Sequence, residues 1–283
     1  LVNWSDTVVV DWGNQTAVLA TRMLSDEANI IVRIHSYEAF TRFPLHFDIY
    51  KIRALIFVSP AILELFSDMY DELGFKKIPK FVIPNFKERN TTLSQKRADS
   101  FGFKICMLQY ATHVKDALFA ISAFEKVFLE DERWHITFAG PNFEESGVPK
   151  DDEKRRAFED KVRELGSAVS VEGYIHNTDE WYLQHDIILS TSIREGTHES
   201  VIEACTTGCI PVFRQWPLLS AYSAVERNFP GFAGVDTPEA MAKQIQYVSQ
   251  NVTTFRQKAI LLAKKKDIKI TFAAFLDMLQ KIK

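Results

Sequence analysis

The feature that most constrains the fold is a regular alternation of short, β-branched apolar runs with helical patterns along the whole chain. In the first third, strands are expected at 7–11, 29–34 and 54–59, and helices at 15–24 and 60–73. Strands that alternate with helices form parallel sheets, because each helix carries the chain back to the start of the next strand. The pattern therefore predicts an α/β fold.

The same rhythm restarts after a polar stretch at 87–100, where we place a domain boundary. Strands are expected at 103–108, 134–139, 169–172, 186–190 and 210–213, and helices at 115–129, 151–165, 178–184, 199–207 and 238–263. This predicts two doubly wound, Rossmann-like domains, an incomplete one at 1–98 and a second one at 99–265. A last helix, within 266–283, has an apolar side that needs a docking surface, for which the first domain is the candidate.

Length and composition are those of a globular protein. The 283 residues suit two domains of ordinary size, and 46% of them are hydrophobic and 25% charged. A net charge of -3 argues against a nucleic-acid partner. The spacing of Phe119, Phe124 and Phe128 within one expected helix indicates core packing and no stacking surface for bases.

The cysteines and the chain start bear on the compartment. Three cysteines, Cys106, Cys205 and Cys209, suit a reducing compartment, and we expect a cytoplasmic protein. No apolar run approaches the ~20 residues of a membrane span. Lysines at 76–80 and 264–266 leave a peripheral contact with the inner face of the membrane as an alternative to a solvated surface. The chain begins without Met and enters a strand almost at once, so we expect a piece of a longer protein; its oligomeric state stays open.

The turn from the strand at 186–190 into the next helix is the segment best suited to chemistry. Gly196 permits close approach of the backbone, and the helix start offers amide hydrogens and a positive dipole end. A diphosphate suits such an end. Glu195 precedes the helix, where it could face a sugar, and Glu203 lies one turn into it, where it could bind a diol such as ribose.

Glu195 and Glu203, followed by the run Gly208-Cys209-Ile210-Pro211-Val212, resemble the signature of the retaining family 4 (group 1) glycosyltransferases of GT-B fold. Segments that resemble the same family in the same order are 57–59, 82–85, 134–141, 171–174 and 181–182. The resemblance covers nearly all residues from 7 to 283. It implies two Rossmann-like domains that face a cleft, with the strands that open the family's first domain missing here.

The resemblance also implies roles for single residues. Glu195 would contact the transferred sugar, Lys115 the diphosphate, and His35 the sugar or phosphate from the N-terminal side, which makes these three the catalytic candidates. A lysine suits the negative charge that builds on a departing diphosphate. The donor-binding candidates are Gly196, Thr197, His198, Glu199, Ser200, Val201, Glu203, Gly140, Tyr174 and Tyr110.

Tyr110 stands where the family usually has an arginine. Either Tyr110 replaces that arginine by hydrogen bonding, or Arg33, Arg194 or His113 supplies the positive charge. His198 with Cys205 and Cys209 matches no common zinc spacing, so we expect core cysteines and no metal site.

The sequence thus predicts a retaining transferase that moves a hexosyl unit from a UDP- or GDP-sugar to a glycan or lipid-linked acceptor, in polysaccharide or glycoconjugate biosynthesis, without a metal or cofactor. Two alternatives keep the fold and change the chemistry: a nucleotide-sugar epimerase and a pyridoxal-type sugar phosphorylase. A third alternative is a domain that binds a nucleotide sugar or a partner without catalysis.

Overall fold

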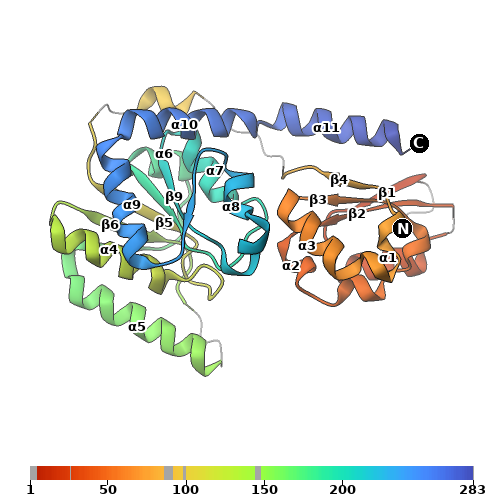
Figure 1. Ribbon diagram of the computed structural model, residues 1–283, viewed down its shortest axis with the longest axis horizontal. Helices are drawn as coiled ribbons and strands as arrows, with labels where there is room; N and C mark the ends of the chain where they lie inside the picture. Colours follow the sequence, from red (N-terminus) through yellow and green to blue (C-terminus); the bar gives the residue numbers. More distant parts are fainter. Residues whose placement is uncertain (1–4, 26, 86–91, 98–99, 144–147, 283) are drawn as a thin grey trace.

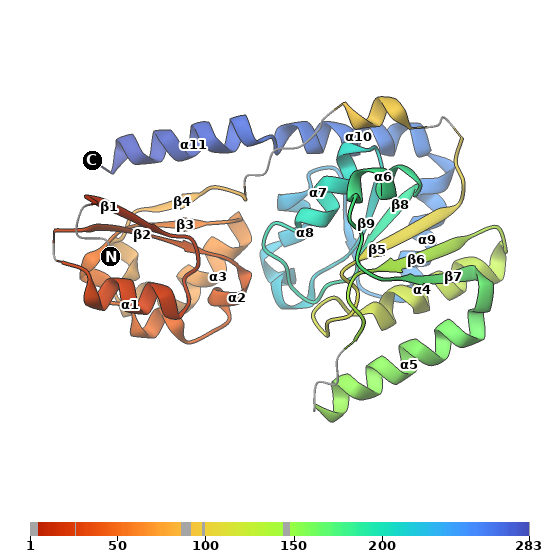
Figure 2. The same cartoon turned by 180° about the vertical axis from the view of Figure 1, so that it is seen from behind.

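The structure is a computed structural model that describes residues 5–25, 27–85, 92–97, 100–143 and 148–282. Two parallel β-sheets lie side by side, each packed against helices, and the last helix reaches from the second sheet to the first (Figure 1 and Figure 2). This confirms the predicted α/β class with two parallel-sheet domains. The boundary expected between residues 98 and 99 lies outside the described residues.

The first sheet has four parallel strands in the order β1-β2-β3-β4. These are β1 (Thr7–Val10), β2 (Asn29–Ile34), β3 (Ile52–Phe57) and β4 (Lys80–Val82). The connecting helices are α1 (Gln15–Met23), α2 (Ser36–Ala39) and α3 (Pro60–Tyr70), with short 3-10 turns at Phe43–His46, Ile49–Lys51, Asp71–Leu73 and Phe75–Lys77.

Both faces of the first sheet are apolar, because β2 and β3 alternate their side chains between two cores. Ile30, Val32 and Ile34 belong to the large core beneath α1 to α3, whereas Ile31 packs on the opposite face with Met278 of the C-terminal helix α11 (Ile268–Lys281). In Figure 1, α1 to α3 lie on one side of this sheet and α11 crosses the other side.

The second sheet has six parallel strands in the order β10-β9-β8-β5-β6-β7. These are β5 (Lys104–Leu108), β6 (His135–Ala139), β7 (Val169–Glu172), β8 (Ile187–Ser190), β9 (Ile210–Arg214) and β10 (Gly234–Val235). This is the doubly wound order, in which the chain moves outward from β5 through β6 to β7 and then returns to β8 on the other side of β5. A ligand crevice is expected where the direction reverses, at the carboxyl ends of β5 and β8.

The helices of the second half are α4 (Ala117–Glu130), α5 (Pro149–Leu165), α6 (Thr178–Leu183), α7 (Glu199–Thr206), α8 (Ala224–Asn228), α9 (Pro238–Gln250) and α10 (Val252–Lys265), with 3-10 turns at Leu93–Lys96, Gly166–Ala168 and Pro217–Tyr222. α4 packs against α5 and α9, whereas α7 packs against α10 and α6. The continuous helix expected at 238–263 is wrong, because Asn251 leaves the helical conformation and separates α9 from α10.

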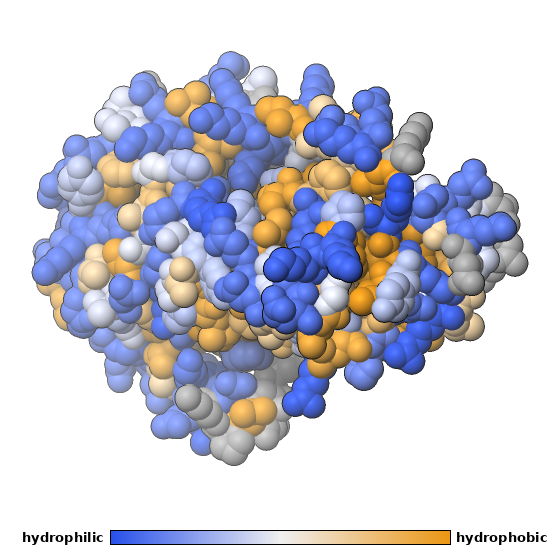
Figure 3. Space-filling model, turned by 45° about the vertical axis from the view of Figure 1, so that its right-hand side comes forward, coloured by the Kyte–Doolittle hydropathy of each residue, from blue (hydrophilic) through white to orange (hydrophobic). Residues whose placement is uncertain are grey.

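The two halves also touch directly, through α3 on one side and α8 with the preceding 3-10 turn on the other. Arg227 forms a 2.6 Å ion pair with Glu64, and the Tyr222 hydroxyl donates to Asp68 at 3.0 Å. Figure 3 shows the molecule turned so that the side of the first half comes forward. Hydrophilic side chains cover most of the face seen in this view, and hydrophobic ones gather near its centre. Among the described helices, none has the length and apolar character needed to cross a membrane.

Candidate functional site

A cavity of about 660 Å³ lies between the two halves, where loops from the carboxyl ends of both sheets meet. The first half contributes Trp12, His35, Ser36, Tyr37 and Asn85, and the second half Leu108, Gln109, Lys115, Gly140, Pro141, Tyr174, Ile175, His176, Thr178, Glu195, Gly196, Thr197, His198, Glu199, Ser200 and Glu203. The lining therefore brings together all the predicted site residues except Tyr110 and Val201. We call this space the cleft cavity.

Glu195 and Lys115 form the central contact of the cleft cavity. They lie on the loops that follow β8 and β5, the two strands that flank the reversal of chain direction. Lys115 Nζ donates to Glu195 Oε1 at 2.6 Å, and Ser192 Oγ donates to the same oxygen at 2.7 Å. A carboxylate with two such donors is fixed in position, so the wall is organised before any ligand binds.

The ionisation of this group follows from its neighbours. Burial works against the Glu195 carboxylate, but the charges of His198 and Lys115 and the hydrogen bonds from Lys115 and Ser192 outweigh it, and its pKa is lowered to about 2. Burial lowers the pKa of His198 to about 3, so this histidine is neutral at pH 7. At neutral pH the carboxylate is therefore held mainly by Lys115 and Ser192.

The loop that carries Lys115 is tied to the neighbouring strands. Thr191, directly after β8, donates its hydroxyl to the Lys115 carbonyl at 2.8 Å. Asp116 adopts a left-handed conformation (φ 50°) and accepts from Arg214 Nη1, at the end of β9, at 2.7 Å. Arg214 in turn lies over the Phe119 ring, 4.3 Å from its centroid. These contacts fix the backbone from which Lys115 reaches Glu195.

His198 stands immediately before α7 in a left-handed conformation (φ 54°) and is buried. Trp216 Nε1 donates to Ser190 Oγ at 3.2 Å, and Ser190 Oγ lies 2.8 Å from His198 Nδ1. A serine hydroxyl that accepts from the indole can donate to Nδ1 or accept from it, so this contact suits either tautomer of the imidazole, and the second ring nitrogen, Nε2, faces Glu195. That nitrogen lies 3.8 Å from Glu195 Oε1.

The start of α7 faces the cleft cavity with Thr197, Glu199 and Ser200, and Glu203 follows one turn further along the helix. Gly196 brings the backbone close to the first half: a Cβ here would lie 2.9 Å from Val58 Cγ2 and 3.6 Å from the Ser36 nitrogen. Only glycine fits this approach without displacement. Gly140 and Tyr174 complete the opposite part of the lining.

His35 closes the cavity from the first half, at the end of β2. Its Nε2 donates to the Asp11 carbonyl at 2.9 Å, and its ring stacks on Trp12 with centroids 4.1 Å apart. Burial lowers the pKa of His35, against the opposing effect of the hydrogen bond to Asp11. The ring is therefore a neutral, fixed wall whose Nε2–H is already engaged.

Tyr110 and Val201 lie outside the lining. Tyr110 is buried among Phe138, Phe143 and Phe158, and its hydroxyl donates to Asn142 Oδ1 at 3.3 Å. Its aromatic ring packs in the apolar core beside β6, and this position gives Tyr110 a packing role. Val201 is fully buried in α7, and its amide donates to the His198 carbonyl at 3.2 Å.

The three candidates for the missing arginine charge also lie outside the lining. Arg33 is buried and donates to the carbonyls of Ile83 and Pro84 and to Asn85, in the segment that leaves β4. Arg194 donates to Ser36 Oγ at 3.2 Å. His113 lines a second cavity, described next.

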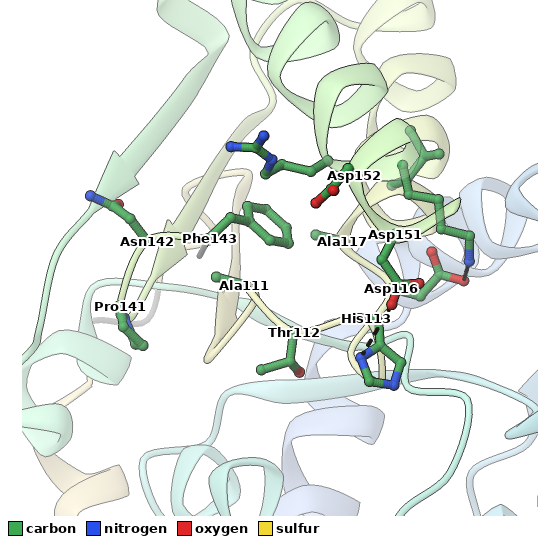
Figure 4. A pocket seen from close by; sticks show the side chains of 13 residues that line it. Ala111, Thr112, His113, Asp116, Ala117, Pro141, Asn142, Phe143, Asp151 and Asp152 are labelled. Atoms are coloured by element: carbon green, nitrogen blue, oxygen red, sulfur yellow. Dashed lines mark ion pairs between the residues drawn. The ribbon is translucent and has the colours of Figure 1, made fainter. Parts of the chain in front are cut away.

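The second cavity, of about 320 Å³, shares Pro141 with the cleft cavity and lies beside the start of α5 (Figure 4). It is lined by Ala111, Thr112, His113, Asp116, Ala117, Leu118, Pro141, Asn142, Phe143, Asp151, Asp152, Lys154 and Arg155. Two side-chain contacts lie within this lining: His113 Nδ1 is 3.9 Å from Asp151 Oδ2, and Lys154 Nζ pairs with Asp116 Oδ2 at 3.6 Å.

Cys106, Cys205 and Cys209 are free and buried, as expected for core cysteines. Within the described part of the chain, no group of three or more His, Cys, Asp or Glu residues is placed to hold a metal ion.

Sequence reasoning missed several residues of the cleft cavity. Ser192 was not singled out, although it lies three residues before Glu195 and donates to it. Trp12 and Tyr37 were also missed, although both follow strands of the first sheet at the edge that faces the cavity. Their position after a strand was the available signal.

Two facing parallel-sheet domains with a polar cavity between them define a GT-B-type protein. The family model described as "Glycosyl transferases group 1" matches residues 104–251, more than half of the chain, and the chain belongs to this family. A comparison with curated proteins gives no match.

Solved structures agree with this fold. A Staphylococcus aureus TarM variant, in complex with fondaparinux, α-GlcNAc-glycerol and UDP, matches 89% of this chain and 50% of its own with 20% identity and a TM-score of 0.69. Anabaena HepE, in complex with UDP and glucose, matches 98% and 78% with 16% identity and a TM-score of 0.72. The pneumococcal O-GlcNAc transferase GtfA, with UDP and GlcNAc, matches 91% and 53% with 16% identity and a TM-score of 0.66. The chain thus spans about half the length of TarM and GtfA.

Proposed function

We propose that this chain carries the donor site of a retaining glycosyltransferase, which moves a hexosyl unit from a UDP- or GDP-sugar to a glycan or lipid-linked acceptor. The observation that carries the proposal is the Lys115–Glu195 contact of 2.6 Å in a cavity that also holds the start of α7 and Glu203. The UDP complexes of TarM and GtfA and the UDP-glucose complex of HepE support a nucleotide-sugar donor. Polysaccharide or glycoconjugate synthesis is the process in which such a step belongs.

Each group of the donor has a suitable partner in the cleft cavity. The diphosphate would lie at the start of α7, where the backbone amides of the first turn and the helix dipole attract anions, with Lys115 beside it. Glu203, one turn further, would accept the ribose hydroxyls. Glu195 would accept hydroxyls of the transferred sugar. The base would extend toward Gly140 and Tyr174.

We infer that donor binding draws Lys115 toward a new partner. In the structure its ammonium group is held by Glu195, and a diphosphate at α7 would compete for it with a larger negative charge. As Lys115 turns to the phosphates, Glu195 Oε1 keeps Ser192 as a donor and becomes available to a sugar hydroxyl. One contact thus couples recognition of the diphosphate to recognition of the sugar.

In the reaction, the bond from the anomeric carbon to the diphosphate oxygen breaks and a bond from the same carbon to the acceptor oxygen forms on the same face. The acceptor proton passes to the departing diphosphate, which leaves as the nucleoside diphosphate. Lys115 and the α7 amides would stabilise the negative charge that builds on this group. The charge is met by protein groups, so the proposal includes no metal or cofactor.

The test is incubation of the full-length protein with UDP-, GDP- and ADP-sugars, with detection of the free nucleoside diphosphate and of the anomeric configuration of any product. We expect turnover with one base, and its loss in Glu203→Ala and Lys115→Met. Absence of both transfer and donor hydrolysis across the panel would remove the enzymatic proposal.

The same assay separates the alternatives. A sugar converted to its epimer without acceptor would identify a nucleotide-sugar epimerase, and absorbance of bound pyridoxal phosphate would identify a phosphorylase. UDP or GDP binding that depends on Glu203, without turnover, would identify a silent binding domain.

We also propose a cytoplasmic location for the protein, since its three cysteines are free and buried, which suits a reducing compartment.

A further inference from the structure

Trp12 is an aromatic side chain on the first-half wall of the cleft cavity, in the loop that follows β1. Its ring stacks on His35 with centroids 4.1 Å apart and planes 12° from parallel, yet 48% of the residue remains exposed. One face of the indole is therefore covered by the imidazole, and much of the rest of the ring is open to solvent.

Two contacts restrict the position of this ring. The next residue, Gly13, packs so closely on β2 that a Cβ here would lie 2.5 Å from Ile34 Cδ1 and 3.3 Å from the Arg33 carbonyl oxygen. His35, beneath the indole, is held by its 2.9 Å hydrogen bond to the Asp11 carbonyl. A rigid aromatic surface loses little conformational entropy when a ligand stacks on it.

The surroundings of Trp12 decide which ligand suits it. The negatively polarised face of an indole attracts the weakly positive C–H groups on one face of a pyranose ring. The polar rim of such a ring needs hydrogen-bonding groups at the side, and Ser36 in the cavity lining and the Asp11 carboxyl group, whose side chain is 65% exposed, lie in the adjoining segments. An alkyl chain would remove water from the exposed Asp11 carboxylate and offer it no hydrogen bond in return, leaving only its 3.7 Å ion pair with Arg33, which is unfavourable.

We propose that Trp12 is the stacking platform of an acceptor subsite that takes a pyranose ring. This rests on the proposed function, since Trp12 faces the cavity from the half opposite the Lys115–Glu195 contact. The acceptor of the reaction is then a glycan whose reacting sugar lies on the indole, close to His35.

The experiment is a saturation-transfer NMR titration of the whole chain, with UDP present, using methyl α- and β-D-glucopyranoside. Glycerol serves as an acyclic polyol and 1,2-hexanediol as an alkyl probe. We expect the pyranosides to receive saturation on their ring C–H groups, and Trp12→Ala to weaken their binding about tenfold, the change that loss of a stacked ring pair produces. Trp12→Phe should restore most of it. Tyr50→Ala, which removes an aromatic side chain that is 94% exposed away from the cavity, should match the wild type.

Pyranoside binding that is absent in the wild type, or equal in Trp12→Ala, would overturn the platform, and so would tighter, Trp12-dependent binding of the hexanediol, which would indicate a lipid. Calorimetry with UDP and with GDP separates this result from the donor site. If neither nucleotide binds while the pyranosides bind through Trp12, the proposed function fails, and Trp12 remains a pyranose-binding surface without an acceptor role. If a nucleotide binds and the pyranosides do not, the platform fails alone.

Discussion

A single oxygen atom, Oε1 of Glu195, organises the second-half wall of the cleft cavity. It accepts hydrogen bonds from Lys115 and Ser192 and lies 3.8 Å from His198 Nε2. Because these groups come from the loops after β5 and β8, the oxygen ties both sides of the chain reversal together. The proposed donor site is therefore sensitive to the charge of each neighbour.

Replacement of Lys115 by methionine should weaken UDP binding about 10- to 100-fold, because a charge-assisted hydrogen bond contributes roughly 1.5–3 kcal/mol. Isothermal calorimetry measures this directly. The variant also leaves Glu195 buried without its cation, so the double variant Lys115→Met/Glu195→Gln should recover stability but not affinity. Lys126→Met is the control, since Lys126 pairs with Glu239 on the exposed surface of α4 and should leave the affinity unchanged. Equal losses in both single variants would contradict the assignment.

The lowered pKa of His198 predicts how the free energy of unfolding depends on pH. Burial lowers its folded-state pKa to about 3, below an unfolded value of about 6.5. Between these values the unfolded chain binds the extra proton, so the free energy of unfolding falls as the pH drops from about 6.5 toward 3. The pKa of Glu195, lowered to about 2, adds stability that is present above its unfolded value and lost as the pH falls through about 2.

We expect His198→Asn, which keeps a residue tolerant of the left-handed conformation, to lose less stability on acidification than the wild type. The difference in slope should approach 1.4 kcal/mol per pH unit, about one proton, between pH 6 and pH 4. Urea unfolding at pH 7, 5.5 and 4.5 tests this. His185, whose pKa burial lowers to about 4, is present in both proteins and cancels. Parallel curves would show that His198 does not titrate in this range.

At the scale of elements, the loop from β8 to α7 depends on close contact with the first half. A methyl group on Gly196 would lie 2.9 Å from Val58 Cγ2, so Gly196→Ala should displace Glu195 and lower kcat/KM for the donor about tenfold or more, because small misplacements are costly in catalysis. Val58→Ala in addition should recover part of the loss by making room. Gly173→Ala is the matched control, since its Cβ would meet no atom within 4 Å. Similar kinetics for the two single variants would disprove the steric argument.

Much of this architecture could be predicted from the sequence, because long β-branched runs and amphipathic segments fix their own conformation. The strands at 29–34 and 169–172 agree with the structure in both limits. The short β4, of three residues, carries too little pattern to be recognised. The break at Asn251, the residue that ends α9 and precedes α10, was missed although asparagine is common at helix N-caps.

The site was predictable where a motif lies on one element and less so where distant loops meet. Glu195, Gly196 and Glu203 share one turn and helix, so their common location could be inferred. The Lys115–Glu195 contact joins residues 80 positions apart and depends on β5 and β8 being neighbours in the sheet. Tyr110 illustrates the opposite case, because its burial among phenylalanine rings is decided by the shape of the core beside β6.

At the scale of the whole molecule, the halves are joined by the segment that leaves the first sheet and by the return of α11, in addition to the contact between α3 and α8. Arg33 on β2 donates to Ile83, Pro84 and Asn85 as the chain leaves the first sheet, and α11 returns to that sheet at the end of the chain. Arg53 on β3 also donates to the Ile282 carbonyl at 2.8 Å. The relative position of the two walls therefore depends on α11.

Replacement of Met278 by aspartate tests that dependence. Met278 is 1% exposed and packs on Ile31, Ala54, Ile56 and Ile83, so a carboxylate here should detach α11 from the sheet and lower the free energy of unfolding by about 3 kcal/mol. Limited proteolysis should then cut faster between α10 and α11, near Asp267. Leu276→Asp is the control, because Leu276 is 45% exposed on the same helix, and it should change neither the free energy of unfolding nor the rate of proteolysis.

The release of α11 by Met278→Asp should affect the two walls differently. UDP affinity should stay within about twofold, because the donor wall belongs to the second half, whereas acceptor-dependent turnover, which needs both walls, should fall. If turnover persists after α11 is released, the contact between α3 and α8 alone sets the geometry of the cavity.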